Sequence, residues 1–147
     1  HRPFRRQRQM CIRDSPRIYA QSINYDVLEP QISENNGIFL SYFTKQNTNK
    51  KINCFITKTN NKTHKIIRDN LNKSAMYSGI IKSQGVRYCP SIEDKITKFG
   101  DRNGHNIFLE PEGLNSDLVY PNGISNSLDK KIQLKFLRSI KGLENVK

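Results

Sequence analysis

The alternation of strand and helix is clearest in INCFITKTNNKTHKIIRDNL, residues 52–71. Its first six residues are mostly β-branched, aromatic or otherwise apolar, a composition typical of a strand. Asn60 is a suitable N-cap, and the apolar residues after it recur at helical spacing, which predicts a helix over residues 62–71. This stretch therefore predicts a strand followed by a helix.

Neighbouring runs extend the pattern. IFLSYFT, residues 38–44, has strand composition, and we expect it to pair with residues 52–57 through a hairpin loop. HNIFLE, residues 105–110, predicts a further strand. EPEG and YPNG predict turns because they contain Pro and Gly.

A last helix is predicted over residues 128–140. Its apolar residues repeat at intervals of four (Leu128, Ile132, Phe136 and Ile140). Ser127 is suited to cap its start, and Gly142 is suited to follow its end. Strands and helices alternate without an internal repeat, so the predicted fold class is mixed α/β.

The charge of the chain is strongly basic. Among 147 residues, 25 are Lys or Arg and 13 are Asp or Glu, which gives a formal charge of +12. Such a balance favours a polyanionic partner such as RNA, although a solvated basic surface explains it equally well.

The first fifteen residues differ from the rest. They carry five arginines and one aspartate and have no helical or strand periodicity. We interpret residues 1–15 as a non-native leader and exclude them from the fold, the alternative being a basic arm that binds RNA. Without them the charge over residues 16–147 is still +8.

The three cysteines form no metal or disulfide pattern. Cys11 lies in the leader, Cys54 in an apolar run and Cys89 in a polar motif, with no CxxC pair. Zinc and structural disulfides are therefore not expected, and Cys54 is interpreted as a small buried residue. His64 has no second ligand at metal spacing and is expected to face solvent or to cap a neighbour. No apolar run reaches the length of a membrane span, so we expect no membrane contact and a cytoplasmic location.

Cys89 belongs to RYCPSIEDK, residues 87–95. Pro90 favours an extended Cys89, and Ser91 with Asp94 forms a carboxylate version of the capping box, which predicts a helix from Ile92. Ile92, Ile96 and Phe99 are expected on its buried side.

The start of this helix suits two kinds of chemistry. The helix dipole and Arg87 favour the thiolate of Cys89, and the same end suits a phosphate or pyrophosphate. A structural cysteine is the competing interpretation, and Glu93 and Asp94 are typical of a solvated helix start. Glu110 and Glu112 are candidate acid or base groups, although carboxylates beside a turn proline more often cap or pair with arginine.

GVRYCPSIEDKITKF, residues 85–99, resembles the signature segment of the glucose-inhibited division protein A family (GidA, also called MnmG), flavoproteins that modify the wobble uridine of tRNA. Val86 stands where the family typically has proline. SINYDVLEPQ, CFITKTNNKTHKIIRDNL, SAMYSGII, HNIFLEPEGLN, YPNGISNSL and LRSIKGLEN resemble further family blocks in family order. The resemblance covers the chain from Pro16 onward.

The resemblance implies an interior fragment of a larger enzyme. Residues 16–86 would be an inserted α/β domain, and residues 87–147 part of a Rossmann-like FAD/NAD-binding domain. No GxGxxG turn is present, so this chain alone is expected to hold FAD poorly and to be inactive.

The resemblance also implies the site and its partners. The family segment is assigned to NAD binding, and the cysteine matching Cys89 to one-carbon chemistry at uridine C5. The cofactors would be FAD and NADH with a folate one-carbon donor, and the partners tRNA, a GTPase (MnmE-like) and a second copy in a homodimer. The implied cofactor-binding residues are Gly85, Val86, Arg87, Tyr88, Cys89, Pro90, Ser91, Ile92, Glu93, Asp94, Lys95, Ile96, Thr97, Lys98 and Phe99.

Two alternatives stay open. One is a basic RNA-binding module without catalysis. The other is the related folate-dependent flavoprotein that methylates a tRNA uridine.

Overall fold

The computed structural model describes residues 14–32, 41–45, 50–79 and 90–147. Five strands form one antiparallel sheet in the order β1-β5-β4-β3-β2. The strands are β1 (Ile18–Tyr19), β2 (Glu29–Gln31), β3 (Cys54–Lys58), β4 (Asn106–Pro111) and β5 (Leu118–Asn122). The predicted mixed class of helices and strands is confirmed.

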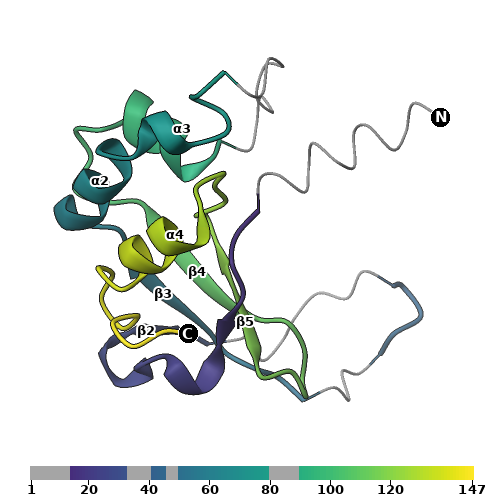
Figure 1. Ribbon diagram of the computed structural model, residues 1–147. Coiled ribbons are helices and arrows are strands. Elements are labelled where there is room, and N and C mark those ends of the chain that lie inside the picture. The colour runs from purple at the N-terminus through teal and green to yellow at the C-terminus, as the bar shows by residue number, and fades with distance from the viewer. Residues whose placement is uncertain (1–13, 33–40, 46–49, 80–89) are drawn as a thin grey trace.

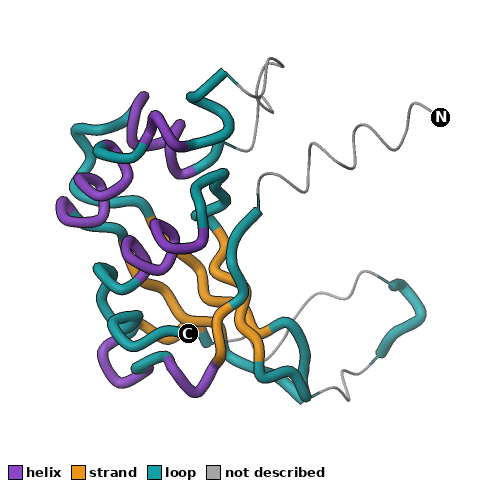
Figure 2. The backbone as a smooth tube through the Cα atoms, viewed as in Figure 1, coloured by secondary structure: helices purple, strands orange, loops and turns teal. Residues whose placement is uncertain are grey.

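Three α-helices lie on one side of the strands (Figures 1 and 2). They are α2 (Asn61–Arg68), α3 (Ile92–Lys98) and α4 (Lys130–Leu137). Short 3-10 turns cover residues 20–22, 25–27 and 71–73. Within the described ranges, no helix is long and apolar enough to cross a membrane.

The strand periodicity places one face of the sheet in the core. Ile107, Leu109 and Val119 are almost fully buried, whereas the residues between them are half-buried or exposed. A period of two is expected where only one face is covered. The helices complete the core with buried Ile67, Phe136 and other apolar side chains.

The long-range pairings join segments from the whole described chain. β3 pairs with β4, and β1 pairs with β5, so strands from both sides of the boundary expected at residue 86 share one sheet. Near the C-terminus, Gly142 O accepts a hydrogen bond from the Asn24 N–H at 2.9 Å. The described residues therefore pack as one unit around a common core.

Several strand and turn predictions need correction. β3 pairs with β2 and β4, not with residues 38–44. Residues 33–40 lie outside the described residues, and residues 41–43 form a bend and turn, not a strand. In YPNG only Gly123 turns, because the preceding three residues belong to β5.

The predicted boundaries of α4 and the predicted burial at the end of α3 also need correction. α4 is capped by Asp129, whose carboxylate accepts from the N–H groups of Lys131 and Ile132, and not by Ser127. α4 ends at Leu137, and turns follow up to Gly142, which has a φ of +83°. Phe99 is 49% exposed because it is the non-helical C-cap of α3, so its predicted burial is wrong.

Candidate functional site

Part of the predicted cofactor segment is visible in the structure. Residues 85–89, including Cys89, lie outside the described residues, and residues 90–99 are described. α3 begins at Ile92 as predicted, because the Ser91 Oγ accepts a hydrogen bond from the Asp94 N–H at 3.2 Å. The capping motif in the sequence therefore correctly predicts where α3 begins.

The start of α3 offers little to a diphosphate. The Ile92 N–H donates to the Ser125 carbonyl at 2.8 Å, and the Asp94 N–H is taken by Ser91. Glu93 and Asp94 add two carboxylates to the first turn. Negative groups there complement the helix dipole themselves and repel a second anion. The N–H groups of Ile92 and Asp94 are thus used within the fold and are not free to bind a diphosphate.

Glu93 is a buried polar junction, not the solvated residue that its position suggests. Its side chain is fully buried, and Oε1 accepts hydrogen bonds from the Ser74 hydroxyl and from the N–H and hydroxyl of Ser127, at 2.8–3.1 Å. Oε2 is buried and has no hydrogen-bond partner among the described residues. Through this carboxylate, α3 is connected to the segment that contains Ser74 and to the segment after β5 that contains Ser127.

The other polar residues of α3 also hold the fold together. Lys95 Nζ donates to the Gly123 carbonyl at 2.8 Å, and the Tyr77 hydroxyl donates to Asp94 at 3.1 Å. Burial raises the pKa of the Tyr77 phenol, and the charge of Asp94 raises it further. Lys98 forms an ion pair with Asp94 at 3.8 Å. In the described part of the segment these side chains serve packing and positioning.

Two histidines lie in the interior beside α2. His64 is 1% exposed, so the expectation that it faces solvent is wrong. The Thr59 hydroxyl lies 2.8 Å from His64 Nε2 and accepts a hydrogen bond from the His105 backbone N–H at 2.8 Å. The two imidazole rings are 5.4 Å apart. Sequence reasoning missed this pair because the residues are 41 positions apart.

The surroundings of the two histidines disfavour the charged form of both imidazoles, as is typical of buried structural residues. Burial lowers the pKa of both imidazoles; Arg68 lowers that of His64 further, and His64, Lys95 and Arg102 lower that of His105. His105 Nε2 is buried without a hydrogen-bond partner in the described part of the chain. Within that part, no group of three metal-ligating side chains occurs.

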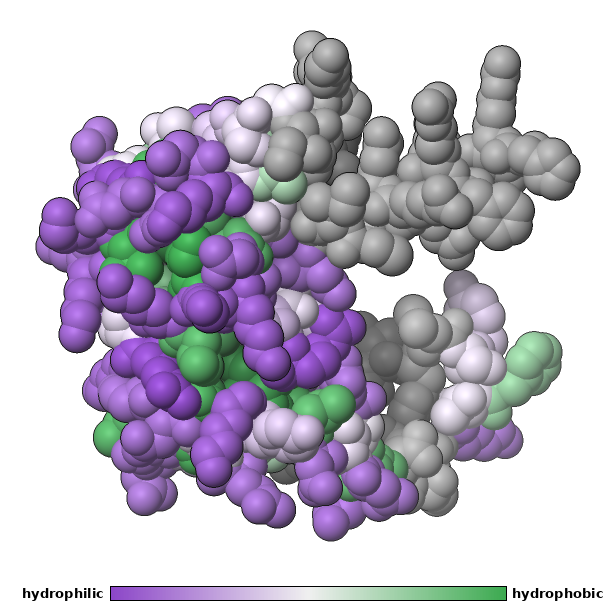
Figure 3. Space-filling view, in the orientation of Figure 1, coloured by the Kyte–Doolittle hydropathy of each residue, from purple (hydrophilic) through white to green (hydrophobic). Residues whose placement is uncertain are grey.

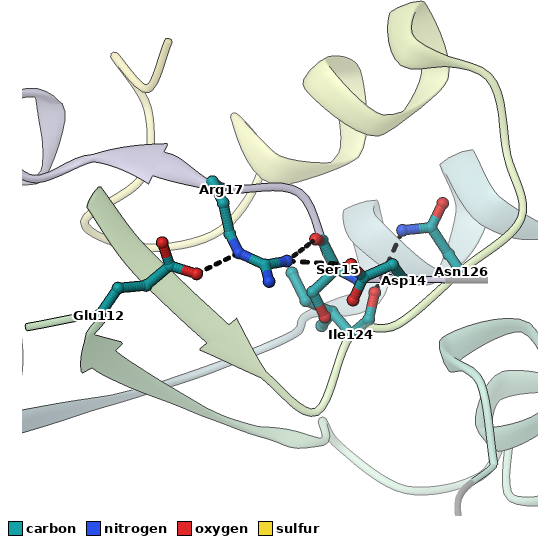
Figure 4. A network of polar contacts seen from close by, with 6 residues as sticks. All are labelled: Asp14, Ser15, Arg17, Glu112, Ile124 and Asn126. Atoms are coloured by element: carbon teal, nitrogen blue, oxygen red, sulfur yellow. Dashed lines mark hydrogen bonds and ion pairs between the residues drawn. The ribbon is translucent and has the colours of Figure 1, made fainter. Parts of the chain in front are cut away.

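The two glutamates that flank Pro111 have structural partners. Glu112 pairs with Arg17, which also binds Asp14 at 3.1 Å (Figure 4). The Arg17 guanidinium also lies over the Tyr120 ring. Glu110 accepts a hydrogen bond from the Asn122 side chain at 3.0 Å. The expected pairing with arginine is therefore confirmed for Glu112, whereas Glu110 binds an asparagine amide instead.

The same network reaches the edge of the expected leader. Asp14 and Asn126 exchange two backbone hydrogen bonds at 3.1 and 3.2 Å, and Ser15 is buried. These two residues pack with the fold, while residues 1–13 lie outside the described residues.

Comparison with known proteins settles the family. The sequence profile of the family Glucose inhibited division protein A matches residues 12–147. The chain belongs to this family. It is 49% identical over 131 residues to a protein of Mycoplasmopsis synoviae (strain 53) named tRNA uridine 5-carboxymethylaminomethyl modification enzyme MnmG. That match covers 89% of this chain and 22% of the relative.

The fold agrees with solved structures of GidA from Aquifex aeolicus. The form I crystal structure matches with a TM-score of 0.80 and 44% identity over 92% of this chain, and the form II structure with 0.77 and 40%. The chain covers 24% and 22% of those two chains. It therefore corresponds to about a quarter or less of a GidA protein.

Proposed function

We propose that the protein of which this chain is a segment adds a carboxymethylaminomethyl group at C5 of the wobble uridine in tRNA. The observation that carries the proposal is the 49% identity to the M. synoviae enzyme across 89% of the chain. A tRNA substrate is consistent with the formal charge of +8 over residues 16–147, and the proposed location is cytoplasmic.

The cofactors and partners follow from the family resemblance. FAD and NADH would supply the redox equivalents and a folate the one-carbon unit, with a GTPase partner (MnmE-like) and a homodimeric assembly. The N–H groups of Ile92 and Asp94 are already used within the fold, so we expect residues 85–89 and regions of the relatives beyond the match to make most of the contacts with these cofactors. We assign the described residues of α3 to supporting that segment.

Cys89 is the proposed nucleophile. A thiolate is the reactive form of cysteine, and a soft nucleophile suits addition to a pyrimidine or to an activated one-carbon unit. Cys54 offers a matched control, because it is a free, half-buried thiol in β3.

The test uses the full-length protein in a strain that lacks this tRNA modification. We expect the wild type and Cys54→Ser to restore the modified nucleoside, and Cys89→Ser to lose it while still binding FAD. Appearance of a 5-methyluridine instead would favour the related methyltransferase. Binding of tRNA without any modification would favour the RNA-binding module, and either result would overturn the proposal.

A further inference from the structure

A basic groove lies between α2 and α4, and none of its described lining residues belongs to the predicted cofactor segment. Its volume is about 420 Å³, and Ile66 and Leu134 line it together with Lys62, Lys131, Lys135 and Arg138. Figure 3 shows a strip of apolar surface between hydrophilic side chains on the face of the molecule that carries these helices. We call this feature the α2–α4 groove.

The charge of the groove is of one sign. Among the described residues, four cationic residues line it and no acidic residue does. The nearest acids on the two helices are already engaged, since Asp69 pairs with Lys65 at 3.3 Å and Asp129 caps α4. Like charges around one depression repel each other, and a bound polyanion relieves this repulsion.

The spacing of the cationic residues on α4 also suits a bound polyanion. Lys131 and Lys135 are one helical turn apart, about 6 Å along the axis, and both are exposed, so they can contact neighbouring phosphates of one strand. The Arg138 guanidinium donates two hydrogen bonds to the Val146 carbonyl, at 3.1 and 3.2 Å. Three of its five N–H donors are left to face a phosphate from a fixed position.

The lining distinguishes a nucleic-acid backbone from a protein partner. Protein interfaces are usually anchored by aromatic side chains in desolvated pockets, and no aromatic residue is among the described residues that line the groove. The described lining residues therefore offer no platform on which a base could stack. The groove therefore suits phosphates, which position an RNA without reading its sequence.

We propose that the α2–α4 groove binds the phosphodiester backbone of the substrate RNA. This inference rests on the proposed function, because it takes tRNA as the substrate. It adds a docking surface outside the segment that carries Cys89.

The experiment compares two double variants of the full-length protein. Lys131→Gln with Lys135→Gln removes two groove charges and keeps good helix formers on α4. Lys45→Gln with Lys58→Gln removes two charges from exposed residues that do not line the groove. Binding of tRNA is measured at several salt concentrations, with polyglutamate as a competing polyanion.

We expect the groove variant to bind tRNA roughly tenfold more weakly than the control variant, with a salt slope smaller by about two units. Its KM for tRNA should rise while kcat is unchanged, and Lys131→Arg with Lys135→Arg should restore binding. Equal binding by the groove and control variants, while the wild type still modifies tRNA, would overturn the inference and leave the proposed function standing. Loss of polyglutamate binding with unchanged tRNA binding would instead point to an acidic protein partner, and would also overturn it.

Discussion

Glu93 joins three segments through a single carboxylate oxygen. Its burial could not be predicted from the sequence, because an acid in the first helical turn normally faces solvent. Glu93 is buried because of residues that are distant in the sequence. Ser74 and Ser127 together supply three hydrogen-bond donors to its Oε1. The same contacts explain why Ser127 does not cap α4.

Removal of the Glu93 carboxylate should destabilise the protein strongly. We expect Glu93→Ala to lower the free energy of unfolding by about 3 kcal/mol, because buried donors lose their acceptor and a cavity is left. Glu93→Gln keeps one acceptor oxygen and should cost clearly less. Urea denaturation of the two variants measures the difference, and equal losses would show that the hydrogen bonds to Oε1 contribute little.

The buried histidines predict a dependence of stability on pH. The folded-state pKa of each lies below the ordinary value of 6.5, so the unfolded chain binds protons first as the pH falls. Their stabilising contribution is complete above about pH 6.5 and decreases as the pH falls towards the lowered folded-state values.

Urea titrations between about pH 5 and pH 7.5 measure this effect, because most carboxylates stay ionised there. His105→Gln cannot take up the proton and should show a smaller fall in stability over this range. An identical pH profile for the variant would contradict the assignment of the effect to this pair.

At the scale of elements, the starts of α2 and α3 were predictable, whereas the cap of α4 and the strand partners were not. Asn60 and Ser91 cap α2 and α3 as expected, since a cap depends only on the next three residues. By contrast, β3 pairs with a segment beginning at Glu29 and with another that ends at Pro111. Such pairing depends on contacts across the whole chain, which periodicity alone does not encode.

The cap of α2 also connects it to the residues that follow α4. The Asn60 Oδ1 accepts from the Thr63 N–H at 3.0 Å, and its Nδ2 donates to the Ser139 carbonyl at 2.6 Å. We expect Asn60→Ala to cost about 2 kcal/mol, one part from the cap and one from the bond to Ser139.

Asn60→Asp separates the two contributions, because a carboxylate caps the helix but cannot donate to Ser139. Thermal unfolding should place this variant between the wild type and Asn60→Ala. A stability of Asn60→Asp equal to that of the wild type would show that the bond to Ser139 contributes nothing.

At the scale of the whole molecule, the N- and C-terminal parts of the described chain meet at Gly142. This residue has a φ of +83°, and a Cβ there would lie 2.5 Å from Leu28 Cδ2. The sequence identified Gly142 as the end of a helix, but it could not identify the segment that packs against it. The position is fixed by the close approach of two chain regions more than a hundred residues apart.

Gly142→Ala should therefore destabilise the protein by about 2–4 kcal/mol, from backbone strain and overpacking together. Gly79→Ala is the matched control, because Gly79 has a φ of +78° and no atom of the described residues lies within 4 Å of the position that a Cβ would take there. It should lose only about 1 kcal/mol. Equal losses in urea denaturation would mean that the contact with Leu28 is unimportant.

The candidate site was predicted only in part, for a physical reason. The start of α3 follows from local signals, whereas the use of its N–H groups and carboxylates within the fold depends on Ser125, Ser127 and Ser74. Cys89 stays a prediction, since it lies outside the described residues.

We propose that this chain is part of a tRNA wobble-uridine modification enzyme. Mass spectrometry of tRNA nucleosides, from a strain whose own enzyme is replaced by the full-length protein, tests this proposal. We expect 5-carboxymethylaminomethyl uridine to return at the wobble position. Unmodified wobble uridine in the presence of folded, FAD-containing protein and its GTPase partner would contradict it.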